Sequence, residues 1–148
     1  MSIYLIVIVG ALLFEYILSC VVKYLDINAL DPKLPKEFSD TFDENKYKES
    51  QHYTKEKTKF SIVTSTISLV VSLILIFSGL YNEIDLFARA MDYNEIFTGI
   101  IFFGILMVIS DIINLPFSIY STFVIEQKFG FNKTTPKTFI SDKIKQYF

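Results

Sequence analysis

Three long stretches of apolar residues, separated by polar connections, dominate the chain. They cover residues 1–22, 60–82 and 96–125, and each contains at most one charged residue. At about 1.5 Å per residue, even the shortest stretch would form a helix of roughly 33 Å, which is enough to cross a hydrocarbon core of ~30 Å. The pattern therefore predicts an all-α, helical integral-membrane protein with three transmembrane helices.

The first stretch has an alternative interpretation as a cleaved leader. Ile17-Leu18-Ser19-Cys20 loosely resembles the lipobox of a bacterial lipoprotein. However, the start MSIYLIVIVG has no lysine or arginine, and Glu15 interrupts the apolar run, whereas a leader begins with positive charge. We therefore expect a retained membrane helix at 1–22.

The other two stretches differ in length and polarity. The span 60–82 has no charged residue, and its Ser and Thr side chains can bond to carbonyls one turn back or form a packing face. The span 96–125 would be about 45 Å long, so it must tilt or project from the bilayer. Pro116 removes a backbone donor within it, which predicts a kink near residues 112–115.

Asp111 is the only charged residue of the third span, and Asn114 lies on the same helical face. A carboxylate at membrane depth faces protein or a water-filled cavity, because lipid does not solvate it. Asp111 and Asn114 are therefore the candidate residues to line a polar chamber, while Ile109 should point away. A hydrogen bond inside the helix bundle is the alternative role for Asp111.

The distribution of lysine predicts the orientation. The connection 23–59 carries eight lysines, the connection 83–95 carries one arginine and no lysine, and the stretch 126–148 carries five lysines. Cytoplasmic segments hold the excess of lysine and arginine. We expect the N-terminus outside or in a lumen and the C-terminus in the cytoplasm, in a bacterial inner membrane or an endoplasmic reticulum-type membrane.

The cytoplasmic connections are predicted to carry long helical extensions. Pro32 and Pro35 keep the start of 23–59 extended, and Ser39 or Asp40 would cap a helix that continues into the second span as far as Tyr81. In 126–148, Gly130 suits a left-handed helix cap. Thr135-Pro136 would then begin an amphipathic tail that leads to a fourth helix outside this sequence.

Charge and composition exclude several functions. With a net charge of −2 and no basic stripe, the sequence gives no support for a nucleic-acid partner, and we expect none. The single histidine, His52, lies among lysines, and a catalytic zinc site needs three protein ligands. Phosphate-loop, dinucleotide-binding and serine-hydrolase motifs are absent from the sequence. We therefore expect no catalytic residue and no metal ligand in this chain.

One segment resembles a known family. Residues 115–145 read LPFSIYSTFVIEQKFGFNKTTPKTFISDKIK, which is similar to the N-terminal membrane domain of the type I CAAX prenyl proteases, integral-membrane zinc metalloendopeptidases. The runs KYKESQHYTKEKTKF and DPKLPKEF also fit, whereas the first span fits by position only. The family-motif residues, without an assigned role, are Pro116, Phe117, Tyr120, Phe123, Glu126, Phe129, Gly130, Phe131 and Asn132.

The resemblance implies a seven-helix enzyme around a hydrophilic chamber, with zinc held by a His-Glu-x-x-His motif. This chain lacks that motif, so zinc is implied only for a full-length member. The implied partners are the lipid bilayer, a C-terminal catalytic part or full-length paralogue, and a prenylated or membrane-associated peptide substrate. We expect residues 1–148 to form one non-catalytic N-terminal membrane domain. The alternative is a stand-alone small membrane interaction protein, and the coding sequence downstream would separate the two.

Overall fold

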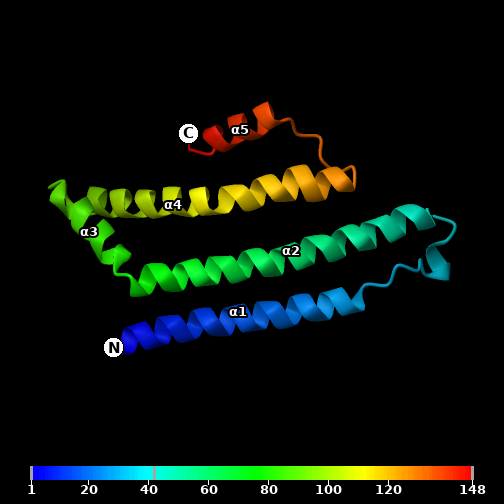
Figure 1. Cartoon of the computed structure of the whole chain (residues 1–148), viewed down its shortest axis with the longest axis horizontal. Helices are drawn as coiled ribbons and strands as arrows, with labels where there is room; N and C mark the ends of the chain where they lie inside the picture. The colour runs from blue at the N-terminus through cyan, green and yellow to red at the C-terminus, as the bar shows by residue number, and fades with distance from the viewer. Residues whose placement is uncertain (1, 42, 148) are drawn as a thin grey trace. The chain divides into compact units, whose positions relative to one another are not determined.

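The computed structural model describes residues 2–41 and 43–147, and over these residues it contains helices and no strand. Figure 1 shows the helices in chain order. They are α1 (Ile3–Ala29), a 3-10 turn (Lys36–Phe38), α2 (Glu44–Phe77), α3 (Leu80–Ala90), α4 (Glu95–Tyr120), a π-helical segment (Ser121–Glu126) and α5 (Pro136–Lys145).

Three helices are long and apolar enough to cross a membrane. They are α1, α2, and α4 with its π-helical continuation, and their most apolar windows have mean hydropathies of 2.6, 2.4 and 2.4. None of the residues in the windows of α1 and α2 is buried within the chain. Apolar helices with exposed surfaces are what a lipid environment stabilises. The predicted all-α fold with three membrane helices is confirmed.

The chain divides into two compact units. The first contains Met1–Leu30 and Thr58–Pro116, and the second contains Asp31–Lys57 and Phe117–Phe148. Helices α2 and α4 each contribute residues to both units.

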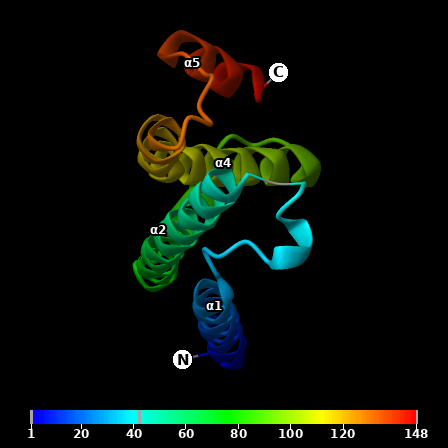
Figure 2. The ribbon, with the colours of Figure 1, turned by 90° about the vertical axis from the view of Figure 1, so that its right-hand side faces the viewer.

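In the first unit, α1 and the apolar part of α2 lie side by side and run in opposite directions, as Figures 1 and 2 show. Helix α4 runs along α2 as well, because side chains from both helices line a common cavity. Helix α3 joins α2 to α4 and buries Ile84 and Ala88, one turn apart on the same face.

The first polar connection begins its long helix later than predicted. Asp43, and not Ser39 or Asp40, caps α2, since its carboxylate accepts hydrogen bonds from the N–H groups of Asn45 (2.8 Å) and Lys46 (3.0 Å). Ser39 instead donates its hydroxyl to the carbonyl of Lys36 and so closes the preceding 3-10 turn. The predicted N-cap was therefore wrong. Ser39 and Asp43 lie in neighbouring polar segments, and either type of residue can bond to nearby backbone groups in a turn or in a helix cap.

Two helix ends also differ from the prediction. Helix α1 continues through the polar residues after Val22 to Ala29. Helix α2 ends at Phe77 and not at Tyr81, because Gly79 adopts a left-handed conformation with φ of 79° and breaks the helix. The predicted outer connection 83–95 is largely the helix α3.

Around Pro116 the helix continues, and its pitch widens five residues later into the π-helical segment. The predicted kink near residues 112–115 stays a prediction. The caps further along the tail are confirmed. Gly130 has φ of 71°, and the N–H of Phe131 bonds to the carbonyl of Glu126 at 2.9 Å, which is the geometry of a Schellman cap. Thr135 accepts a hydrogen bond from the N–H of Thr138 at the start of α5.

Candidate functional site

A row of hydroxyl side chains lies along α2 in the apolar span, and most of them share one side of the helix. Thr66 donates to the carbonyl of Ile62 at 2.8 Å and Thr64 donates to that of Ser61 at 3.1 Å, so these two hydroxyls are satisfied about one turn back, as predicted. Bonds of this kind let a hydroxyl group lie at membrane depth without being an unsatisfied donor. We call the row the α2 hydroxyl row, and it comprises Ser61, Thr64, Ser65, Thr66, Ser68 and Ser72.

Helix α1 meets the hydroxyl row with two polar side chains. The hydroxyl groups of Tyr16 and Thr66 are 2.7 Å apart and share a hydrogen bond. Two turns further along α1, the Lys23 ammonium donates to the Ser65 hydroxyl at 2.9 Å and to the Ser61 carbonyl at 3.4 Å. These contacts fix the register of α1 against α2 in a region where lipid offers no competing hydrogen bonds.

A cavity of about 310 Å³ lies along this contact. Glu15, Tyr16 and Ser19 of α1 line it together with most of the hydroxyl row and with Asn114 of α4. Glu15 is its only charged lining residue, and it has no hydrogen bond or ion pair with any described residue. The cavity is polar enough to hold water within the span.

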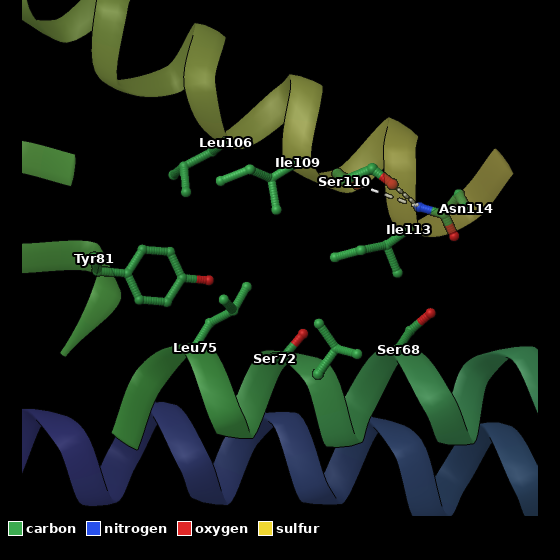
Figure 3. A pocket seen from close by; sticks show the side chains of 10 residues that line it. Ser68, Ser72, Leu75, Tyr81, Leu106, Ile109, Ser110, Ile113 and Asn114 are labelled. Atoms are coloured by element: carbon green, nitrogen blue, oxygen red, sulfur yellow. Dashed lines mark hydrogen bonds between the residues drawn. The ribbon is translucent and has the colours of Figure 1, made fainter. Parts of the chain in front are cut away.

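A second cavity, of about 270 Å³, lies between α2 and α4. Figure 3 shows Ser68 and Ser72 pointing up from α2, Asn114 and Ser110 lying across on α4, and the Tyr81 hydroxyl entering from α3. Both cavities share Ser68, Ser72 and Asn114, so one polar seam runs between α1, α2 and α4.

The two candidate chamber residues, Asp111 and Asn114, differ in the cavities that they line. The Asn114 amide donates to the Ser110 carbonyl at 2.8 Å and lines both cavities. Asp111 is half-buried, makes interactions within the described chain, and lines neither of these two cavities. Ile109, expected to point away from the chamber, lines the 270 Å³ cavity, which does not include Asp111. Chamber lining by Asp111 and Asn114 stays a prediction.

In the second unit, the family motif packs against the polar part of α2. The ring of Tyr53 contacts Phe131 with centroids 4.6 Å apart and Phe129 with centroids 5.5 Å apart. Lys128 pairs with Glu56, and Lys57 pairs with Glu126 at 3.6 Å. We call this set the α2 clasp: Tyr53, Glu56, Lys57, Glu126, Lys128, Phe129 and Phe131.

Lys57 lies before the apolar part of α2 begins at Phe60. The hydrogen bond that it shares with Tyr53 is the largest cause that raises the pKa of Lys57, and the Glu126 carboxylate raises it further. The lysine therefore stays charged and interacts with both Tyr53 and Glu126 within the clasp.

The remaining family-motif residues are not members of the clasp. Gly130 forms the left-handed cap, and its two neighbours in the sequence, Phe129 and Phe131, are the phenylalanines of the clasp. Asn132 accepts from the N–H of Thr134 at 2.7 Å, and Phe123 contacts Phe139 of α5 with ring centroids 5.5 Å apart. Pro116 lies inside α4, whereas Phe117 and Tyr120 interact with other described residues.

His52 lines a shallow cavity of about 330 Å³ next to the clasp, together with Glu49 and Glu56. Among the residues that the structure describes, no group of three histidine, cysteine, aspartate or glutamate side chains has the geometry of a metal site.

Sequence reasoning missed the clasp ion pairs and α3. The paired residues of the clasp are about 70 positions apart, so no local spacing signals them. The helical signal in LYNEIDLFARA was present, since Ile84 and Ala88 are four residues apart, as on one helix face.

The spans, the polar seam and the clasp define a helical integral-membrane protein. The family described as "CAAX prenyl protease N-terminal, five membrane helices" matches residues 23–148. The chain therefore belongs to the CAAX prenyl protease N-terminal family, which confirms the resemblance in residues 115–145.

Individual relatives agree. The chain is 35% identical over 130 residues to "Probable CAAX prenyl protease 1" of Schizosaccharomyces pombe, a match that covers 79% of this chain and 27% of that protein. It is 30% identical over 148 residues to "CAAX prenyl protease 1 homolog" of Dictyostelium discoideum, covering 95% and 35% respectively. The chain thus spans about a quarter to a third of the length of these curated relatives.

A solved structure shows the same arrangement. The crystal structure of S. mikatae Ste24p superposes with a TM-score of 0.85 at 30% sequence identity. The match covers 99% of this chain and 36% of that one. The helices described above therefore correspond to a part of a larger helical membrane protein.

Proposed function

We propose that this chain serves as the non-catalytic N-terminal membrane part of a CAAX prenyl protease-like zinc metalloendopeptidase. The observation that carries the proposal is the match over 99% of this chain to a third of Ste24p, together with a sequence that has one histidine and no His-Glu-x-x-His motif. The zinc and the peptide-cleaving chemistry then belong to a segment outside these 148 residues.

In this role the chain contributes spans and not reacting groups. The polar seam supplies a polar surface between the helices that water can reach. The clasp holds residues 126–131 close to α2, on the side that we propose to be cytoplasmic. The substrates of the assembled enzyme are then prenylated or membrane-associated peptides, and its membrane is of the endoplasmic reticulum type. The N-terminus lies in the lumen, as the lysine distribution supports.

The proposal is tested with three membrane preparations. One contains this chain, one contains the Schizosaccharomyces pombe relative without its matching N-terminal segment, and one contains both. We expect no tightly bound zinc and no cleavage of a prenylated CAAX peptide from this chain alone, and zinc-dependent cleavage when both pieces are present. One zinc held per chain by this protein alone would contradict the non-catalytic role. Two inserted pieces that stay inactive together would favour the stand-alone interaction protein.

A further inference from the structure

A separate cavity of the first unit lies where α3 meets the start of α4. It has a volume of about 520 Å³, and its lining includes Asp85, Arg89, Tyr93, Glu95, Thr98 and Phe102. None of these residues belongs to the polar seam or to the clasp. The cavity is therefore distinct from the seam and the clasp, to which the proposed function assigns roles.

The position of the cavity places it at the surface of the bilayer. The span of α2 ends at Phe77 and that of α4 begins at Glu95, so the segment between them lies at a membrane–water boundary. Along α4, Glu95 to Phe102 rises about 10 Å. The headgroup layer on each side of a bilayer is roughly 5–8 Å thick. The cavity thus extends through the headgroup depth to the first hydrocarbon.

Helix α3 has the character of an interfacial helix. Its residues Ile84 and Ala88 are buried, whereas Leu86 and Phe87 leave 53% and 55% of their surface exposed. Exposed apolar side chains on a helix at this boundary insert into the acyl region. A phospholipid is therefore the molecule that meets the cavity wall.

The cavity holds a well-positioned cation. Arg89 is the only arginine of the chain, and its Nε donates to the Asp85 carboxylate at 2.8 Å. The Arg89 side chain makes no hydrogen bond or ion pair with any described residue other than Asp85, so the terminal amino groups of the guanidinium have no further hydrogen-bond acceptor within the described chain. A guanidinium with that edge open is suited to bidentate binding of a phosphate.

The cavity also contains carboxylate and aromatic groups that can bind a cation. The hydrogen bond and charge of Asp85, and then the charge of Glu95, raise the pKa of Arg89, so both carboxylates act on the same guanidinium. The Tyr93 ring is 62% exposed beside them. Two carboxylates and one guanidinium carry a net charge of −1, which disfavours a purely anionic headgroup. A headgroup with both a phosphate and an ammonium matches both signs.

We propose that this cavity binds the headgroup of a zwitterionic, amine-bearing phospholipid of the bilayer. The phosphate lies on the terminal amino groups of Arg89, and the ammonium lies between the Glu95 carboxylate and the Tyr93 ring. The acyl chains continue along α3 and the first turns of α4.

The test uses the full chain in vesicles of equal phosphatidylethanolamine and phosphatidylglycerol, with the lipids that stay bound counted by native mass spectrometry. We expect about a threefold excess of phosphatidylethanolamine, the size of effect that one partly exposed charge contact gives. Glu95→Gln should reduce the ratio to about one, because the ammonium loses its carboxylate. Arg89→Gln should lower the total of both lipids retained.

Glu83→Gln is the matched control. Like Glu95→Gln it removes one negative charge, but Glu83 lies in α3 and does not line the cavity. Its lipid ratio should equal that of the unmodified chain, and helix content by circular dichroism should be the same for all variants. An equal or reversed lipid ratio in the unmodified chain would overturn the proposal. So would a control that loses as much selectivity as Glu95→Gln.

Discussion

Individual polar contacts hold α1 to α2. Tyr16 hydrogen-bonds to Thr66, and Lys23 hydrogen-bonds to the Ser65 hydroxyl and to the Ser61 carbonyl. The sequence predicted that the α2 hydroxyls could bond within their own helix or pack against a neighbour, and they do both. It did not predict which α1 residues they meet, because helix register depends on the packing of whole faces.

Removing the Tyr16–Thr66 hydrogen bond should weaken the α1–α2 contact. In a double-mutant cycle of Tyr16→Phe and Thr66→Val, we expect a coupling energy of about 0.6 kcal/mol, the mean for hydrogen bonds between membrane helices, whose maximum is about 1.7 kcal/mol. The free energy of unfolding in detergent micelles measures it. Tyr24→Phe on the same helix is the control, because Tyr24 is 64% exposed and should show no coupling to Thr66. A coupling energy of zero for the Tyr16 pair would contradict the contact.

Within the clasp, the aromatic contacts should stabilise more than the ion pairs. Tyr53→Ala should lower the free energy of unfolding by about 2 kcal/mol, because a half-buried ring loses two aromatic partners. Glu56→Gln should cost less than about 1 kcal/mol, since the Glu56 and Lys128 side chains are 42% and 58% exposed and solvent screens their attraction. Thermal unfolding of both variants gives the order, and the reverse order would show that charge dominates the clasp.

At the scale of elements, patterns in the sequence predicted the apolar spans and both caps of the tail. The long apolar runs and the Thr135-Pro136 and Gly130 signals are local, and local signals survive folding. The start and end of α2 were predicted less well. Several capping residues precede Glu44, and Gly79 was not recognised as the break.

The cap at Gly130 offers a clean test. Both Gly130 and Gly104 have open space around an added Cβ, but only Gly130 has a positive φ. Gly130→Ala should therefore destabilise the chain by about 1 kcal/mol, because an L-residue is strained in the left-handed region. Gly104→Ala, within α4, should be neutral or stabilising by about 0.5 kcal/mol. Thermal unfolding of the two variants decides, and equal effects would contradict the cap.

At the scale of the whole molecule, the lysine distribution predicts a cytoplasmic 23–59 connection and an outer 83–95 connection. Single cysteines at Ser50 and Asn94, in a background with Cys20→Ser, should react with a membrane-impermeant reagent from opposite sides of sealed vesicles. Mass spectrometry of the labelled protein gives the side. Labelling of both positions from the same side would contradict the number of crossings.

The family membership extends what the single sequence allowed. Residues 115–145 carried the resemblance, and the clasp shows that several of these residues contact α2 and stabilise the second unit. Their packing partners were not predictable from the spacing in the sequence, because they lie about 70 residues away. The zinc chemistry has no residues in this chain from which it could be predicted.

The most direct measurement replaces the matching N-terminal segment of the Schizosaccharomyces pombe relative with this chain and assays cleavage of a prenylated CAAX peptide in membranes. If this chain is the N-terminal membrane part of such an enzyme, the chimera should bind zinc and cleave at a rate within about tenfold of the unmodified relative, which corresponds to an activation free energy at most ~1.4 kcal/mol higher. A membrane-inserted chimera that binds zinc but cleaves no peptide would contradict the account.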